Sequence, residues 1–283
     1  MVHKKYVASA IILTIIIGFN LYIANQTQKD VIVLATTTSV ENSGLLDILI
    51  PVFENQYGVN VKVIARGSGV AADLAKNGEV DAILIHAPSL EDELINSGYG
   101  VNKTTLWFNF FVIVGPSKDP ANVSMSSSAR EAFVRIYTAG ENKKIEFYSR
   151  GDLSGTHIKE MEIWENSSLR VSAEDSDWYL ETGTGMASTL TISAENNGYT
   201  LSDMGTYLQL KENANIKSDI IFDGDQILYN PYSYLIVSPI KFPDRNKEFA
   251  LLFLEFLLKN STMELVSNYK IAGKVLFTPI SSK

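Results

Sequence analysis

The sequence contains no cysteine among its 283 residues. This absence excludes disulfide bonds, thiolate metal sites, iron–sulfur clusters and cysteine nucleophiles. It also excludes a lipid-modified cysteine as a membrane anchor. Histidine is scarce as well, since only His3, His86 and His157 occur, and they are too scattered to predict a metal site. We therefore expect no bound metal and no cofactor.

Positive charge is in short supply. The 24 Lys and Arg residues face 32 Asp and Glu residues, which gives a formal net charge of -8. A nucleic-acid-binding protein needs a cationic surface that displaces counterions, so we expect no nucleic-acid partner. An anionic ligand would not be attracted by this overall charge either. Its recognition would require a local site of N–H, O–H and guanidinium donors.

The common catalytic motifs are missing too. The sequence has no Walker P-loop and no nucleophile-elbow motif. Ser154 and His157 leave an exported Ser/His hydrolase open as a different class of function. The two residues lie at one expected helix start and lack a clear orienting acid, so we predict that the protein is not an enzyme.

The N-terminus has the pattern of an export segment. Lys4 and Lys5 precede an apolar run at residues 6–24, and a polar stretch follows. The run approaches the length of a membrane-spanning helix, so a cleaved signal peptide and an uncleaved membrane anchor both stay open. In either case the positive-inside rule places the body of the protein outside the cytoplasm, secreted or anchored to the outer face of the membrane.

The rest of the chain alternates short apolar strands with amphipathic helices, which favours an α/β fold with a parallel sheet. Strands are expected at residues 31–35, 59–65 and 81–86, with helices at residues 45–57 and 70–77 between them. Gly58 is expected to end the first of these helices, and Pro51 to kink it or delay its start.

Two later segments resemble each other. Residues 110–116 and 233–239 are both apolar strands that end at a proline. We expect the chain to enter a second lobe after the first segment and to return through the other. The predicted organisation is an export segment at residues 1–30, lobe I at 31–115 and 235–283, and lobe II at 116–234. An amphipathic stretch at residues 245–269 predicts a pair of helices packed on lobe I.

Two strand-to-helix junctions of lobe I offer hydrogen-bond donors. Residues 36–39 (Thr-Thr-Thr-Ser) and 66–69 (Arg-Gly-Ser-Gly) each follow an expected strand and precede a helix. Helix N-termini have unpaired N–H groups, and ligands of open α/β sheets bind at the carboxyl ends of the strands. Ordinary helix capping and an ordinary tight turn are the alternatives. Four hydroxyls in a row exceed what capping needs, which favours an anion site.

The third junction lies in lobe II. Residues 149–157 combine Arg150, two glycines, the hydroxyls of Ser154 and Thr156, and the start of a helix expected at 158–164. Arg150 is suited to a charge-assisted contact with an oxyanion, unless it forms only a surface ion pair. Asp152 would repel the anion and is expected to orient Arg150, and a structural role is favoured for His157.

The sequence resembles the TupA-type tungstate-binding proteins of ABC transporters, from about Val31 to the C-terminus. The resemblance is carried by the segments Ala35–Ser39, Ser43–Asp47, Ile85–Pro88, Val112–Pro116, Ser149–Asp152, Ser154–His157 and Trp178–Met186. It implies a two-lobed type II periplasmic-binding-protein fold with two hinge-crossing strands. It also implies a monomer that captures tungstate and delivers it to an ABC permease and its ATPase.

The resemblance also implies the residues that contact the oxyanion. With Ser154 from the third junction, the expected ligand-binding residues are Thr37, Thr38, Ser39, Ser68, Arg150, Ser154 and Thr156. Leu153, Phe110 and Arg66 depart from the family pattern, and Arg66 would add a cation near the anion. Molybdate, phosphate and sulfate share the tetrahedral shape of tungstate and stay open as alternative ligands.

Overall fold

The computed structural model describes residues 30–213 and 216–280. The predicted export segment, with its apolar run at residues 6–24, lies outside this part of the chain. No helix within the described ranges has the length and apolar character needed to cross a membrane.

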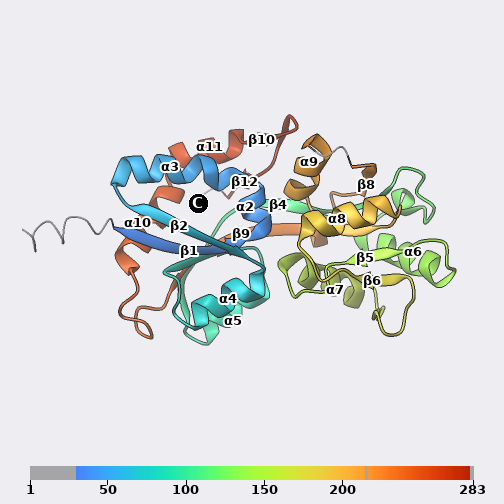
Figure 1. Ribbon diagram of the computed structural model, residues 1–283, viewed down its shortest axis with the longest axis horizontal. Helices are drawn as coiled ribbons and strands as arrows, with labels where there is room; N and C mark the ends of the chain where they lie inside the picture. The colour runs from blue at the N-terminus through green and yellow to red at the C-terminus, as the bar shows by residue number, and fades with distance from the viewer. Residues whose placement is uncertain (1–29, 214–215, 281–283) are drawn as a thin grey trace, which may run out of the picture.

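Two α/β bodies lie end to end (Figure 1). The first contains the parallel strands β1, β2 and β3, and it corresponds to the predicted lobe I. Its elements are β1 (Val31–Thr37), α2 (Thr38–Asn42), α3 (Leu45–Tyr57), β2 (Asn60–Arg66), α4 (Ser68–Lys76), β3 (Ala82–Ile85), α5 (Pro88–Asn96), α10 (Lys247–Leu257), α11 (Asn260–Asn268), β10 (Lys270–Ile271), β11 (Lys274–Val275) and β12 (Thr278–Pro279).

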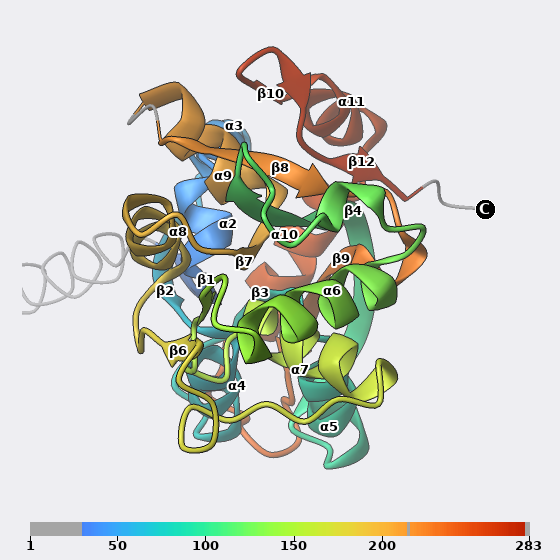
Figure 2. The same ribbon diagram turned by 90° about the vertical axis from the view of Figure 1, so that its right-hand side faces the viewer.

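The second body corresponds to the predicted lobe II and is seen end-on in Figure 2. Its small sheet pairs two short strands, β5 and β6, in parallel. Its elements are η1 (Val123–Met125), α6 (Ala129–Glu141), β5 (Phe147–Ser149), α7 (Gly155–Asn166), β6 (Tyr179–Glu181), α8 (Met186–Glu195), β7 (Thr200–Asp203), α9 (Met204–Asn213), β8 (Ser218–Phe222) and η2 (Gln226–Leu228).

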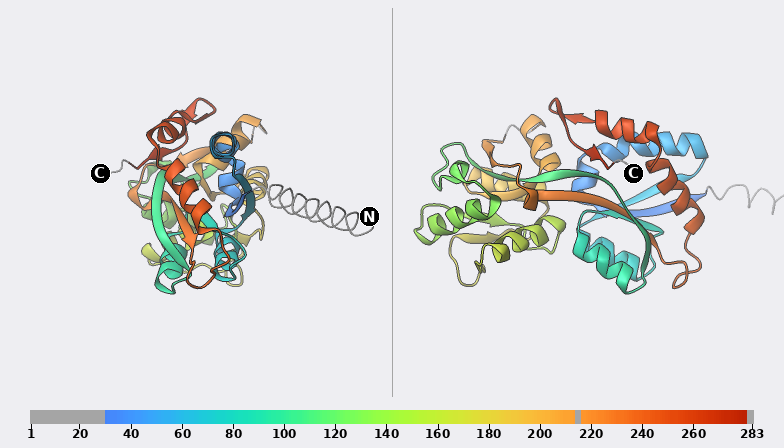
Figure 3. Two further views of the ribbon diagram at one scale, coloured as in Figure 1. Left: turned by 90° about the vertical axis from the view of Figure 1, so that its left-hand side faces the viewer. Right: turned by 180° about the vertical axis from the view of Figure 1, so that it is seen from behind.

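Two long strands, β4 (Gly100–Pro116) and β9 (Tyr229–Val237), run between the bodies (Figure 3). They pair antiparallel from Gly100 to Phe110, and the remainder of β4 pairs with β7 and β8. A single strand therefore pairs with strands of both lobes. The two-lobed type II fold with two crossing strands is confirmed, whereas the boundary residues proposed for the lobes stay a prediction.

Alternation along β1 explains why its first five residues, Val31–Ala35, are all apolar. Ile32 and Leu34 face the cluster beneath α3, α10 and α11, while Ala35 faces the cluster beneath α4 and α5. Successive side chains of a strand point to opposite faces, so a strand covered on both sides reads as a continuous apolar run. The sheet of lobe I is accordingly a buried central layer.

The helices begin and end close to where the sequence predicts. Gly58 ends α3 in a left-handed conformation, with φ of 71°, and donates its N–H to the carbonyl of Glu54. The two predicted C-terminal helices, α10 and α11, are confirmed. One start was wrong: α7 begins at Gly155, three residues before the predicted start, because the Ser154 hydroxyl caps it.

Lobe II has its own core, which places a tryptophan against a helix glycine. Gly140 lies in α6, and a methyl group added there would overlap the indole ring of Trp178. Trp178 is buried in the same cluster as Phe133 and Trp164.

Substituting Gly140→Ala is expected to destabilise the protein by about 1–3 kcal/mol, the usual cost of overpacking. In an unobstructed helix the same change would stabilise by up to about 1 kcal/mol. The sign of the effect in urea denaturation therefore checks the packing, and a gain in stability would contradict it.

Candidate functional site

The carboxyl ends of three parallel strands bring the first-lobe residues together. β1 pairs with β2 so that Thr37 lies opposite Arg66, and it pairs with β3 so that Thr36 lies opposite Leu84. The loops that follow these strands therefore emerge side by side at one edge of the sheet. The loop after β1 carries Thr37 and Ser39, the loop after β2 carries Ser68, and the loop after β3 carries His86.

The hydroxyls of the first junction have different tasks. Thr37 accepts a hydrogen bond from the N–H of Val40 and caps α2, and its hydroxyl lies 3.0 Å from that of Ser39. Thr36 donates to the carbonyl of Leu84, so it serves the sheet. Thr38 is half-buried in the first turn of α2. Thr37 and Ser39 are thus the buried hydroxyl pair of this junction.

The third junction supplies a capping serine and a buried threonine. The Ser154 hydroxyl accepts from the N–H of His157 and caps α7. The hydroxyl of Thr156 is buried, with the residue 1% exposed, and it has no hydrogen-bond partner among the described residues. A buried hydroxyl without a partner carries a desolvation cost, and a bound acceptor would remove it.

Arg150 is the cation of the site. It is 5% exposed, which rules out the surface ion pair considered from the sequence. Its Nη2 and Nε donate to the Oδ2 of Asp152 at 2.5 and 3.1 Å, while Oδ1 accepts from the N–H of Ser154. Asp152 therefore orients the guanidinium, as expected, and both of its oxygens are engaged.

The two lobes touch at this point. The N–H of Gly155, at the start of α7, donates to the Ser68 hydroxyl at 3.2 Å. A methyl group added to Gly155 would lie 3.0 Å from the ring and the carbonyl of His86. A side chain at position 155 would crowd this approach, so glycine allows the start of α7 to lie directly against the first lobe.

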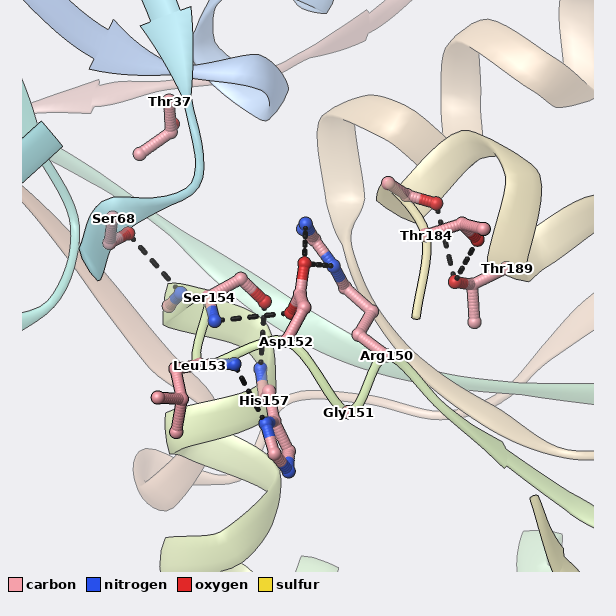
Figure 4. Close-up of polar contacts among 12 residues, drawn as sticks. Thr37, Ser68, Arg150, Gly151, Asp152, Leu153, Ser154, His157, Thr184 and Thr189 are labelled. Carbon is pink, nitrogen blue, oxygen red and sulfur yellow. Dashed lines mark hydrogen bonds and ion pairs between the residues drawn. The ribbon is translucent and has the colours of Figure 1, made fainter. Parts of the chain in front are cut away.

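Figure 4 shows Thr37 and Ser68 on the first-lobe side, with Arg150 and Ser154 opposite them on the second. Thr37, Ser39, Ser68, Arg150, Ser154 and Thr156 are buried at or next to these junctions, and Thr38 is half-buried beside them. That these seven residues bind an anion stays a prediction. Arg66 is exposed and its Nη1 bonds to the carbonyl of Ala65. The expectation that Arg66 adds a cation to the site is not supported by this contact.

Sequence reasoning missed a fourth junction, between β6 and α8. The hydroxyls of Thr182 and Thr189 lie 2.7 Å apart, and Thr184 is within 3.4 Å of both. Figure 4 places Thr184 and Thr189 beyond Arg150. The sequence Thr-Gly-Thr-Gly at 182–185, between a strand and a helix, was the available signal.

His157 has a structural role. Its Nδ1 accepts from the N–H of Leu153, which adopts a left-handed conformation with φ of 55°. Burial is the main cause that lowers the pKa of His157. The Ser154 hydroxyl meets the backbone of His157 and not its ring, so the arrangement is a helix cap with no nucleophile–base pair.

A separate hollow of about 1010 Å³ lies at the other end of lobe II, lined by residues such as Lys144, Asp177 and Trp178. It is at the start of β5, whereas the site is at the end of β5. No predicted site residue lines it. Within residues 30–213 and 216–280, no group of His, Asp and Glu side chains is arranged to hold a metal ion.

Two lobes that close on a set of hydroxyls, N–H groups and one guanidinium define a solute-binding protein. Agreeing with this, a family model described as a PBP superfamily domain matches residues 24–261. Tungstate-binding protein TupA of Peptoclostridium acidaminophilum is 37% identical over 257 residues, which are 90% of this chain and 87% of that protein.

Two further similarities agree with this one. A provisionally named ABC transporter anion-binding protein of Haloferax volcanii is 43% identical over 249 residues, 87% of this chain and 71% of that protein. The solved structure of the tungstate-binding protein TupA from Desulfovibrio alaskensis G20 has a TM-score of 0.77 and 37% identity, covering 89% of this chain and 100% of the other. The chain therefore belongs to the PBP superfamily and, within it, to the family of TupA-type binding proteins. It is a binding protein and not an enzyme.

A buried carboxyl, that of Glu160, is hydrogen-bonded to the residue that precedes Arg150. Glu160 of α7 accepts hydrogen bonds from Tyr179, Ser149 and Trp164, and Ser149 directly precedes Arg150. Burial outweighs these bonds and raises the pKa of Glu160 to about 7 from 4.5. The folded protein therefore holds a proton on Glu160 that the unfolded chain releases above about pH 4.5, so this group's contribution to stability falls as pH rises towards 7.

Glu160→Gln keeps the shape without the ionisation: its oxygen can still accept from Tyr179 and Trp164, and its NH2 donates to the Ser149 hydroxyl as a protonated carboxyl would. We expect the variant to match the wild type near pH 4.5 and to be more stable by about 1–3 kcal/mol at pH 8. Urea denaturation of both proteins across pH 4.5–8 measures the difference. A stability difference that does not change with pH would contradict the raised pKa.

Proposed function

We propose that this protein captures tungstate outside the cytoplasm and delivers it to the permease of an ABC transporter. Arg150 and the unpartnered Thr156 hydroxyl carry the proposal, because both are buried and lie at the junction with the first-lobe hydroxyls. One cation with several neutral donors suits a small divalent anion that sheds its water. Relatives named as tungstate-binding proteins support the same ligand.

The chemistry of the pocket favours a fully deprotonated anion. A carboxylate at the site could accept a hydrogen bond from a protonated ligand, and Asp152 is the one that belongs to the predicted junction. Its two oxygens are already engaged by Arg150 and by the N–H of Ser154. Hydrogen phosphate would have to compete with these donors for the remaining lone pairs of Asp152, whereas a fully deprotonated anion needs only the donors. Molybdate, which has the same shape and charge, is the second candidate.

A thermal-shift panel with tungstate, molybdate, phosphate, sulfate and chromate tests the ligand. A ligand that binds the native state at 100 times its Kd adds about 2.7 kcal/mol to the free energy of unfolding. The melting temperature rises as a result. We expect the largest shift with tungstate. Equal shifts for all five anions, or none, would overturn the tungstate assignment.

Arg150→Ala is expected to weaken tungstate binding by about 100-fold or more, because a buried charge-assisted contact is lost and Asp152 is left unpaired. Arg66→Ala is the matched control: it removes an exposed arginine at another strand-to-helix junction and should leave the affinity unchanged. Isothermal titration calorimetry measures both variants. Wild-type affinity in Arg150→Ala would show that the site lies elsewhere.

Closure of the lobes couples binding to delivery, since a ligand that contacts both lobes shifts the population to the closed form. Gly155→Ala obstructs this closure at His86. We expect the melting temperature of the anion-free variant to stay near that of the wild type, while the shift produced by tungstate shrinks. Small-angle scattering should show a larger radius of gyration for the variant than for the wild type in excess tungstate, and equal radii would contradict the obstruction.

The remaining predictions are part of the same proposal. Residues 6–24 act as a signal peptide or as an anchor on the outer face of the membrane, and the protein works as a monomer with the permease and its ATPase as partners. Lobe I comprises residues 31–115 and 235–283, and lobe II residues 116–234. N-terminal sequencing of the exported protein distinguishes cleavage from anchoring.

A further inference from the structure

His86 connects the first-lobe hydroxyls to the crossing strands. It follows β3, is 4% exposed and stacks on the ring of Tyr232 at a centroid distance of 4.9 Å. Its Nε2 lies 2.9 Å from the Ser39 hydroxyl, and its Nδ1 lies 2.9 Å from the Asn230 side chain. Both ring nitrogens are therefore hydrogen-bonded, and one of them faces a residue of the candidate anion site.

The chain of hydrogen bonds continues into the hinge. The Asn230 amide lies 2.8 Å from the amide of Asn109 and 2.9 Å from the Tyr232 hydroxyl. Asn109 of β4 and Asn230 of β9 are register partners where the two strands cross between the lobes. A continuous path thus runs from the anion site through His86 to the hinge strands.

A path of this kind can be polarised in two directions. If the Asn230 oxygen faces His86, Nδ1 carries the proton and Nε2 accepts from Ser39. The Ser39 proton then points away from the ligand, and Ser39 offers only a lone pair to it. In this direction the buried Nδ2 of Asn109 also has no partner among the described residues.

Reversing both amides gives the other direction in the same space, because an amide oxygen and nitrogen are nearly equal in size. The Asn230 nitrogen then donates to His86 Nδ1, and its oxygen accepts from Asn109 and Tyr232. His86 donates through Nε2 to Ser39, whose own proton is then free to reach the anion, either directly or through the Thr37 hydroxyl 3.0 Å away. The two directions leave the same number of amide hydrogens, two, without a partner in this network, so the amides alone do not favour either one. A bound acceptor-only ligand favours the second direction, because Ser39 can bond to it only as a donor.

The ring carries a single proton in either direction. Burial is the main cause that lowers the pKa of His86 to about 4, nearby Arg150 lowers it further, and Asp203 and the Asn230 bond oppose the shift. At neutral pH the imidazole is therefore uncharged. Its proton must occupy one nitrogen or the other, and that choice decides whether Ser39 is a donor.

We propose that His86 is a positioning residue that, in the anion-loaded protein, holds its proton on Nε2 and so makes Ser39 a hydrogen-bond donor to the ligand. Asn230 sets this tautomer from the hinge. When Ser39 donates its proton to the ligand, the site favours oxyanions that are fully deprotonated over those that carry a proton. The inference rests on the proposed function, since it takes the ligand of this site to be an acceptor-only oxyanion.

Nitrogen-15 NMR of the histidine rings in the tungstate-loaded protein tests the tautomer directly. We expect the shifts of His86, assigned with a His86→Gln sample, to show a protonated Nε2 and a bare Nδ1. A protonated Nδ1 in the loaded protein would overturn the tautomer proposed for His86 while leaving the proposed tungstate binding intact. Absence of tungstate binding by the wild type would instead overturn the proposed function, and with it the role proposed for His86.

Two substitutions of similar length separate the donor from the packing of the ring. His86→Gln retains an N–H that can reach Ser39, whereas His86→Met has none. We expect His86→Gln to bind tungstate roughly tenfold or more tightly than His86→Met in calorimetry, the usual range for a hydrogen bond to a group that contacts a charge. Equal affinities for the two folded variants would overturn the role assigned to His86, and the NMR measurement needs neither variant to bind.

Discussion

Parallel pairing of β1 with β2 and β3 is the constraint on which the rest of this structure depends. It places the ends of three strands at one edge, so that the loops carrying Thr37, Ser68 and His86 are neighbours although they are far apart in the chain. Each loop then leads into a helix, α2, α4 or α5. Without that pairing the hydroxyls would be ordinary caps on separate helices.

The second lobe completes this edge with charge and with a close approach. Arg150 is held by Asp152, and the start of α7 meets the first lobe through the N–H of Gly155. An acidic protein thereby keeps one oriented cation at the place where both lobes meet. The net charge of the Arg150–Asp152 pair is close to zero. Selectivity among oxyanions therefore depends mainly on which neutral groups donate hydrogen bonds and which accept them.

Hydrogen-bond direction makes the hinge part of the site. His86 directly follows β3, and Asn230 and Asn109 belong to the strands that cross between the lobes. Bending at the hinge and the orientation of Ser39 are therefore properties of one network. This arrangement offers a physical route by which the shape of the closed protein and the protonation state of its ligand depend on each other.

Local sequence patterns were enough to predict the alternation of strands and helices, the two crossing strands and the three donor-rich junctions. These are local properties, fixed by apolar periodicity, by glycines such as Gly58 and by hydroxyls that precede helices. The sequence also carried the family resemblance that the comparisons confirmed. Arg66 and Arg150 looked alike at this level, because each precedes a glycine at a strand end.

Which of these residues act together depends on contacts between distant parts of the chain. Arg66 is exposed and Arg150 is buried, a difference that depends on what packs against each loop and not on the loop itself. His86 looked like an isolated histidine until β3 placed it beside β1, and its partner Asn230 lies 144 residues away. Contacts between distant segments depend on how strands pair and how lobes close, and local sequence patterns do not encode them.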